Sequence, residues 1–424
     1  MILQGLKWIF RLILAGMTIA LMSSCTMLGL NYASLNTDNK PAPTPTLTLP
    51  FDDVETRATL ENELYGPWPG NLPVSVGEAR IVDDAYLNGR GTLEEVMLTI
   101  GEGDGARTFP VVIAYPNEAK DAPVPLIISQ TFSGNCSVFP NDPVTQFGGE
   151  ICEGSEMNGV FGFLATNIFG TYIAYAPIDR YFDAGLAYAS FSGWSFVPDT
   201  NGSAQTVMAK LGPGPQPTSA LMSWAYGYHA AATVFGQDPR IQAEAITALG
   251  HSRYGKAALI ASGWSDQIAA ALAHQSGFGG SSSSRSTTGE TLVRMAKSYP
   301  HWLRPELGAE LEEGFILTLD QHYLLALSAP KPIFLGNGRR DVWSDPNSSF
   351  VLARAADTIY ESRGVGGLGD TENMQVFDPG AEISYWLRAG GHSVVSEDID
   401  AFTAFMNAHF GAAARDEMTL QSEQ

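Results

Sequence analysis

The sequence predicts an α/β protein, a three-layer sandwich with a mostly parallel central sheet and helices on both faces. Two observations support this prediction. Short, continuous apolar runs are bounded by Gly, Pro or Asp, as is typical of strands buried on both faces. Segments with helical periodicity lie between most of these runs. Strands that alternate with helices along the chain indicate a wound α/β sheet.

The expected strands cover residues 109–115, 126–132, 186–191, 245–249, 268–273 and 332–335, and a further strand-like stretch covers 383–387. The expected helices cover residues 218–235, 256–263, 289–298, 320–328, 348–362 and 399–410. In such folds the functional side chains lie at the carboxyl ends of the strands, and we expect the site at that edge.

Composition and charge exclude several classes of protein. The chain has 424 residues, 45% hydrophobic and 16% charged, which suits a large folded core rather than a disordered chain or a coiled coil. Its net charge of −21 would repel a phosphate backbone, so no nucleic acid partner is expected. Three cysteines are too few for a disulfide scaffold. No zinc-binding spacing is present, and we expect neither metal nor cofactor.

The first 25 residues have the features of an export signal. Lys7 and Arg11 precede an apolar stretch over 12–22, and small residues then lead to Cys25. The stretch is short for a membrane-spanning helix. Small residues that end at a cysteine resemble a bacterial lipobox, so we expect Cys25 to carry a lipid, with plain secretory cleavage as the alternative.

The domain prediction follows from this start. A Pro- and Thr-rich tether with an N-terminal extension is expected over 26–70, and a single α/β domain over 71–415. We expect an exported monomer that faces the periplasm or the surface and contacts a membrane only through its lipid anchor. Export places Cys136 and Cys152 in an oxidising compartment, where they can pair or remain free thiols.

The strongest signal for chemistry is a serine between a strand and a helix. The apolar strand that ends at Leu249 leads directly into Gly250-His251-Ser252 and then into good helix formers. This is the setting of a nucleophile elbow, the sharp turn that exposes the catalytic serine of α/β-hydrolases. Tyr254 stands where the generic motif has its second glycine, and Gly255 follows one position later. A serine that merely caps the helix is the plain alternative.

A serine nucleophile requires a base, which in α/β-hydrolases follows the serine late in the chain. His392 fits this position because it follows the strand-like residues 383–387 and precedes the last expected helix. A histidine in an exposed turn is the alternative. His274, His301 and His322 also follow Ser252. His274 and His301 are second choices, whereas a core or packing role is expected for His322, which lies within the helical pattern at 320–328.

The triad acid is expected between the serine and the base. Asp341 follows the expected strand 332–335, which is the usual place for this acid. Asp345, four residues later, is the second choice.

The segment from Gly250 to Lys256 resembles the G-x-S-R-x-G-K signature of the glucuronoyl esterases, a carbohydrate esterase family with the α/β-hydrolase fold. Further family-like motifs occur in order at residues 275–280, 289–291, 300–302, 320–327, 329–332, 341–343 and 390–392. The similarity extends over roughly residues 75 to 412. It implies hydrolysis of 4-O-methyl-glucuronate esters that link glucuronoxylan to lignin alcohols.

The resemblance also implies roles for individual residues. Ser252 would be the nucleophile, His392 the base and Asp341 the acid, while Arg253 would donate to the oxyanion. Lys256, Glu290 and Trp343 would contact the sugar. Each has a plainer alternative: a surface ion pair for Arg253, a favourable charge at a helix start for Glu290, and a core position for Trp343.

One position departs from the family pattern. Many members have a glutamate as triad acid where this chain has Gln275. A glutamine cannot stabilise an imidazolium by charge. Other members, chiefly bacterial, place the acid after the later strand, where Asp341 lies, so we expect Asp341 to act alone.

The sequence therefore predicts a serine-dependent carboxylic ester hydrolase that prefers uronate esters. An acetyl or general carboxylesterase on the same scaffold is the first alternative. A glycan-binding lipoprotein with a decayed hydrolase site is the second, and the joint presence of Ser252, Arg253, His392 and Asp341 argues against it.

Overall fold

The computed structural model describes residues 45–147, 169–211, 218–369 and 373–411. The expected export signal, Cys25 and Cys152 lie outside these residues. Cys136 is disulfide-bonded, so the free-thiol alternative does not hold for it. Within the described ranges, no helix combines the length and apolar character that a membrane span requires.

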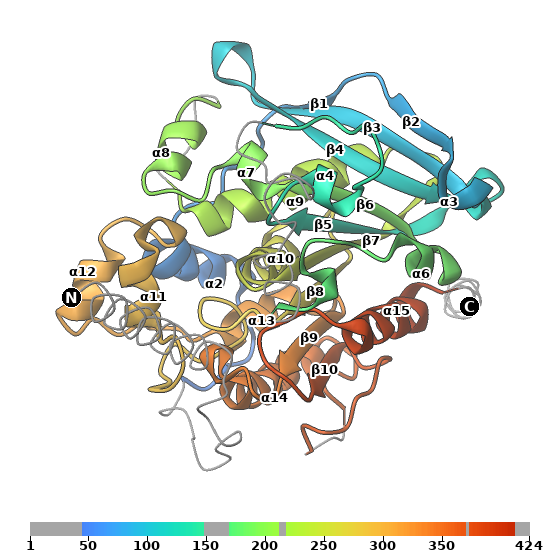
Figure 1. Cartoon of the computed structure of the whole chain (residues 1–424). Coiled ribbons are helices and arrows are strands. Elements are labelled where there is room, and N and C mark those ends of the chain that lie inside the picture. Colours follow the sequence, from blue (N-terminus) through green and yellow to red (C-terminus); the bar gives the residue numbers. More distant parts are fainter. Residues whose placement is uncertain (1–44, 148–168, 212–217, 370–372, 412–424) are drawn as a thin grey trace, which may run out of the picture.

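A ten-stranded mixed sheet forms the centre of the molecule, with strand order β1-β3-β4-β6-β5-β7-β8-β9-β10 and β2 paired to β3 (Figure 1). The strands are β1 (Val74–Val76), β2 (Arg80–Ala85), β3 (Gly91–Ile100), β4 (Arg107–Pro116), β5 (Val124–Thr131), β6 (Ala187–Ser192), β7 (Ile241–His251), β8 (Ala270–His274), β9 (Ile333–Gly338) and β10 (Ile383–Arg388). The strands β6, β5, β7, β8, β9 and β10 lie side by side in this order, and each pairs in parallel with its neighbours among them.

The end of the sheet formed by β1 to β4 is antiparallel, which corrects one prediction. The run at 109–115 was expected among the parallel strands, but it lies in β4 and pairs antiparallel with both β3 and β6. The prediction also missed β1, β2 and β3. β2 has no buried residue, since its strand lies at the margin of the sheet, so it lacks the apolar run that marks a buried strand.

Helices cover both faces of the sheet. They are α2 (Asp53–Leu60), α3 (Tyr86–Gly89), α4 (Asn135–Val138), α6 (Ile178–Asp183), α7 (Gly193–Phe196), α8 (Ser203–Met208), α9 (Ala220–Phe235), α10 (Arg253–Trp264), α11 (Leu292–Ser298), α12 (Leu307–Glu312), α13 (His322–Ser328), α14 (Pro346–Ser362) and α15 (Ser396–Phe410). Short helical turns lie at Glu61–Tyr65, Gly103–Gly105, Asn117–Lys120, Thr171–Ile173, Pro300–Trp302 and Val342–Ser344.

Side chains of β5 show how the two layers form, because successive residues of a strand face opposite sides. Leu126 and Ile128 belong to one core cluster, which contains the buried faces of α9, α10, α13 and α14. Ile127 belongs to the other cluster, with α6 and α15. The predicted mostly parallel sheet with helices on both faces is confirmed.

Residues 53–65, within the expected N-terminal extension, form helices that pack against the core. Asp52 caps α2 by accepting hydrogen bonds from two backbone amides of its first turn. Leu60, Leu64 and Tyr65 are buried in the larger core cluster. Residues 53–65 therefore pack as part of the folded unit.

Candidate active site

Ser252 occupies a strained turn between β7 and α10. Its backbone has φ 56° and ψ −118°, outside the regions that side-chain-bearing residues prefer. A Cβ at Gly250 would lie 2.0 Å from the carbonyl oxygen of Tyr254, so this position requires glycine. Tyr254 is fully buried and packs its ring against Trp224. The turn thus has the geometry of a nucleophile elbow, with the tyrosine serving as core in place of the motif's second glycine.

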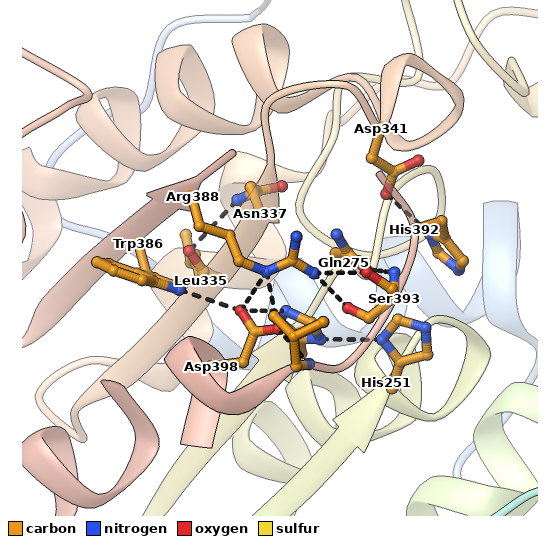
Figure 2. A network of polar contacts seen from close by, with 12 residues as sticks. His251, Gln275, Leu335, Asn337, Asp341, Trp386, Arg388, His392, Ser393 and Asp398 are labelled. Atoms are coloured by element: carbon orange, nitrogen blue, oxygen red, sulfur yellow. Dashed lines mark hydrogen bonds and ion pairs between the residues drawn. The ribbon is translucent and has the colours of Figure 1, made fainter. Parts of the chain in front are cut away.

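His392 and Asp341 form a close pair at the same edge of the sheet. His392 Nδ1 lies 2.7 Å from Asp341 Oδ2, and the Asp341 side chain is inaccessible to solvent (Figure 2). Burial alone would raise the pKa of Asp341. The charge of His392 and hydrogen bonds from His392 and Ser344 outweigh burial and hold that pKa below its ordinary value. Asp341 is therefore an ionised carboxylate that orients His392 through Nδ1.

A cavity of about 290 Å³ lies beside these residues. All of the candidate triad and substrate residues except Asp341 line it, namely Ser252, Arg253, Lys256, Glu290, Trp343 and His392. Asp341 stands behind His392 and reaches the cavity only through it. Aromatic side chains add further wall, including Phe132, Tyr299 and Trp302. Trp343 is therefore not a core residue.

The second-choice residues and His322 lie elsewhere. His274 and His322 are fully buried, and His322 Nε2 lies 2.6 Å from the carbonyl oxygen of Pro45. Asp345 caps α14 by accepting a hydrogen bond from the backbone amide of Ser348. His301 is not among the residues that line the cavity, and its Nε2 lies 2.7 Å from Asp199 Oδ1. Of the three candidate bases, the described cavity wall therefore contains His392 and neither second choice.

Asp199 is the residue of this site that the sequence did not reveal. Its carboxylate forms an ion pair with Arg253 and accepts hydrogen bonds of 2.7 Å from His301 Nε2 and Trp302 Nε1. Burial and the Arg253 charge lower the pKa of His301 to about 4, so a neutral His301 is the donor. The Arg253 pair is largely enclosed rather than a surface ion pair.

Lys256 provides a second cation at the site. Its side chain is 3% exposed, and its ammonium donates to the carbonyl oxygen of Ser276. Burial is the largest influence and, together with the Arg253 charge, lowers the pKa of Lys256 to about 8, although Glu290 and Asp341 act in the opposite direction. The ammonium is thus charged at neutral pH and close to losing its proton.

A strained serine, a histidine–carboxylate pair and an adjoining cavity at the carboxyl edge of this sheet define a serine hydrolase with the α/β-hydrolase fold. The chain is also similar to one carbohydrate esterase family. The sequence profile described as "Glucuronyl esterase, fungi" matches residues 160–364.

Individual relatives agree with this match. Carbohydrate esterase MZ0003, from an unknown prokaryotic organism, is 27% identical over 375 residues, which cover 85% of this chain and 84% of that protein. The 4-O-methyl-glucuronoyl methylesterase of Phanerochaete carnosa is 26% identical over 347 residues, 75% of this chain and 80% of its own.

Solved structures give the same result. A promiscuous CE15 esterase from a marine bacterial metagenome superposes with a TM-score of 0.73 at 25% identity, covering 89% of this chain and all of its own. The glucuronoyl esterase of Solibacter usitatus has a TM-score of 0.70 at 25% identity, covering 85% and 92%. The α/β-hydrolase fold and the resemblance to the glucuronoyl esterase family, both predicted from the sequence, are confirmed.

Proposed function

We propose that this protein is a serine-dependent carboxylic ester hydrolase that cleaves uronate esters, with 4-O-methyl-glucuronate esters between glucuronoxylan and lignin alcohols preferred. One observation carries the proposal. The cavity that contains Ser252 and His392 is also lined by a half-buried arginine, Arg253, and by a buried lysine and a buried glutamate, Lys256 and Glu290. The predicted enzyme class agrees with the activities that name the curated relatives.

The geometry suits the two halves of an acyl-enzyme mechanism. His392 accepts the hydroxyl proton of Ser252 while the serine oxygen bonds to the ester carbonyl carbon. The alcohol then leaves with that proton, and a water molecule, deprotonated by His392, releases the acid and restores the serine. Asp341 stabilises the imidazolium of both halves, since its carboxylate remains ionised beside Nδ1.

We propose that Arg253 stabilises the negative oxygen of the tetrahedral intermediate. Two contacts that fix its guanidinium support this: its carbon lies 4.8 Å from the centre of the Trp302 ring, and the group forms an ion pair with Asp199. A cation that is fixed before the reaction favours a negative charge that develops only during the reaction.

The remaining polar residues suit a sugar acid rather than a simple acyl chain. Lys256 can donate to sugar hydroxyls, and Glu290 can accept from them. The backbone amide of Glu290 donates to the carbonyl oxygen of Trp343 over 2.9 Å, so these two residues keep a fixed relation. The Trp343 indole offers a face on which a pyranose ring can stack.

A general carboxylesterase is the second candidate. One observation favours it: the solved marine metagenomic esterase, which covers most of this chain, is described as promiscuous. The two candidates differ in whether Lys256 and Glu290 contribute to the rate.

Benzyl glucuronate and p-nitrophenyl acetate separate these candidates when the release of acid from each is measured with the same enzyme. The proposal expects a clear preference in kcat/KM for the glucuronate ester. Activity on the acetate alone would keep the triad and reject the uronate assignment. A serine-directed phosphonate that fails to label Ser252 would indicate a binding protein instead.

We further propose that the protein is an exported monomer held to a membrane by lipid on Cys25. The charged start, short apolar stretch and small residues before Cys25 support this. Cys25→Ala should move the full-length protein from the membrane fraction to the soluble fraction. Unchanged membrane association of that variant would reject the lipid anchor.

A further inference from the structure

The side chain of Gln275 bridges the two residues on either side of His392. Its Nε2 donates to the carbonyl oxygen of Gly391 over 2.8 Å. Its Oε1 accepts from the backbone amide of Ser393 over 2.9 Å (Figure 2). Gln275 directly follows β8 and is 1% exposed. Both hydrogen-bonding ends of one buried amide are thus used on the loop that carries His392.

This contact requires an amide. A primary amide offers a donor at one end and an acceptor at the other, which matches one carbonyl and one N–H of the loop. A glutamate would place a second acceptor against the Gly391 carbonyl oxygen, and a methionine would make neither bond. The absence of a side chain at Gly338 leaves the space that this contact needs. A Cβ at this position would lie only 2.6 Å from both the Gln275 Nε2 and the Gly391 oxygen.

The residues directly before His392 contribute no side chain that could hold the shape of the loop. Gly390 and Gly391 precede His392 and bring no side chain, and Gly390 has a φ of 101°. On the other flank, Arg388 donates to the carbonyl and, over 3.0 Å, to the hydroxyl oxygen of Ser393. Glycine pairs sample many backbone conformations, so contacts from outside the loop must select one.

Arg388 is itself fixed by a buried carboxylate. Its Nε lies 2.8 Å from both oxygens of Asp398, which is completely buried at the start of α15 (Figure 2). Gln275, which directly follows β8, and Arg388, at the end of β10, therefore both hold the residues that flank His392. Of these two residues, Gln275 alone contacts both Gly391 and Ser393 through hydrogen bonds shorter than 3 Å between uncharged groups.

We propose that Gln275 is a positioning residue for His392. On this proposal the Gln275 amide has a function of its own and is not merely the absence of the family's glutamate. The inference rests on the proposed ester hydrolase function. The proposed mechanism requires His392 to keep Nδ1 on Asp341 while Nε2 reaches Ser252, and a displaced loop would break that alignment. A glutamine at position 275 is therefore compatible with an active enzyme, in which Asp341 is the triad acid and Gln275 holds the loop that carries His392.

The test compares Gln275→Met and Gln275→Glu with the wild-type enzyme on benzyl glucuronate. Both variants should lose kcat by about 10- to 100-fold, as expected for a small misplacement of a base, with KM within about twofold. The rate at which a phosphonate labels Ser252 should fall in parallel, because this reaction also needs the aligned histidine. A merely structural role would lower the melting temperature and leave these rates unchanged.

Gln321→Met is the matched control. Gln321 is also a buried glutamine, but its Oε1 accepts from the hydroxyl of Tyr65, away from the His392 loop. This variant should lose stability and keep kcat. A kcat equal to that of the wild type in Gln275→Met, or in Gln275→Glu, would overturn the proposed positioning role of Gln275. An inactive wild-type enzyme would instead reject the proposed function, so the two failures are distinguishable.

Discussion

Asp199 forms an ion pair with Arg253, the residue that directly follows the expected nucleophile. The same carboxylate accepts from His301 and Trp302, so it joins the start of α10 to the aromatic wall of the cavity. An oxyanion donor is effective only when it is fixed before the charge develops. We infer that Asp199 fixes Arg253.

Asp199→Asn tests this relationship. The amide would turn N–H donors toward groups that are themselves donors, and Arg253 would lose its counter-charge. We expect kcat on a glucuronate ester to fall by about 10- to 100-fold, somewhat less than is usual when an oxyanion donor is removed outright. Asp183→Asn is the control, because Asp183 pairs with Arg90 on the surface and its loss should change nothing. Equal rates for both variants would contradict the inference.

Asp341→Ala should lower turnover by about 10³- to 10⁴-fold, because it removes the ionised carboxylate that pairs with His392 Nδ1. Steady-state kinetics and a phosphonate labelling rate would both report the loss. Asp345→Asn serves as the comparison. An asparagine can still cap α14, so this variant should keep its turnover. Near-normal activity of Asp341→Ala would remove Asp341 from the triad.

The low pKa of Lys256 predicts a pH dependence of substrate binding. Below pH 8 its ammonium is charged and donates strong hydrogen bonds, and above pH 8 the charge is lost. KM for benzyl glucuronate should therefore rise as the pH passes from 7 to 9, after subtraction of spontaneous hydrolysis.

Lys256→Met should have a raised KM at pH 7 and no such rise toward pH 9. Lys331→Met is the matched control, because burial also lowers the pKa of Lys331 to about 8 but its ammonium holds the carbonyl oxygens of Ser262 and Ser265. If KM of the wild-type enzyme is flat across this range, Lys256 does not bind substrate as an ammonium.

The features predicted correctly from the sequence were those with a local signal. A buried parallel strand is a continuous apolar run, and an elbow is a glycine and a serine between a strand and a helix, so β7, Ser252 and α10 could be found directly. The run at 109–115 has the same apolar character although it is antiparallel, because both its faces are also covered. The sequence of such a run therefore does not indicate whether the strand is parallel or antiparallel to its neighbours.

Contacts between distant segments had no such signal. Asp199 lies in a loop more than fifty residues before Arg253, and no local pattern distinguishes it from a solvated aspartate. Gln275 was visible only as a missing acid. Its function depends on two backbone groups more than a hundred residues later, which the fold alone brings within hydrogen-bonding distance.

The most direct test of the central claim is the release of glucuronic acid from benzyl glucuronate by the wild-type protein and by Ser252→Ala. The account predicts turnover by the wild type that exceeds its turnover of p-nitrophenyl acetate, and a loss of several orders of magnitude in the variant. Equal rates for the two proteins, or no release by either, would contradict it.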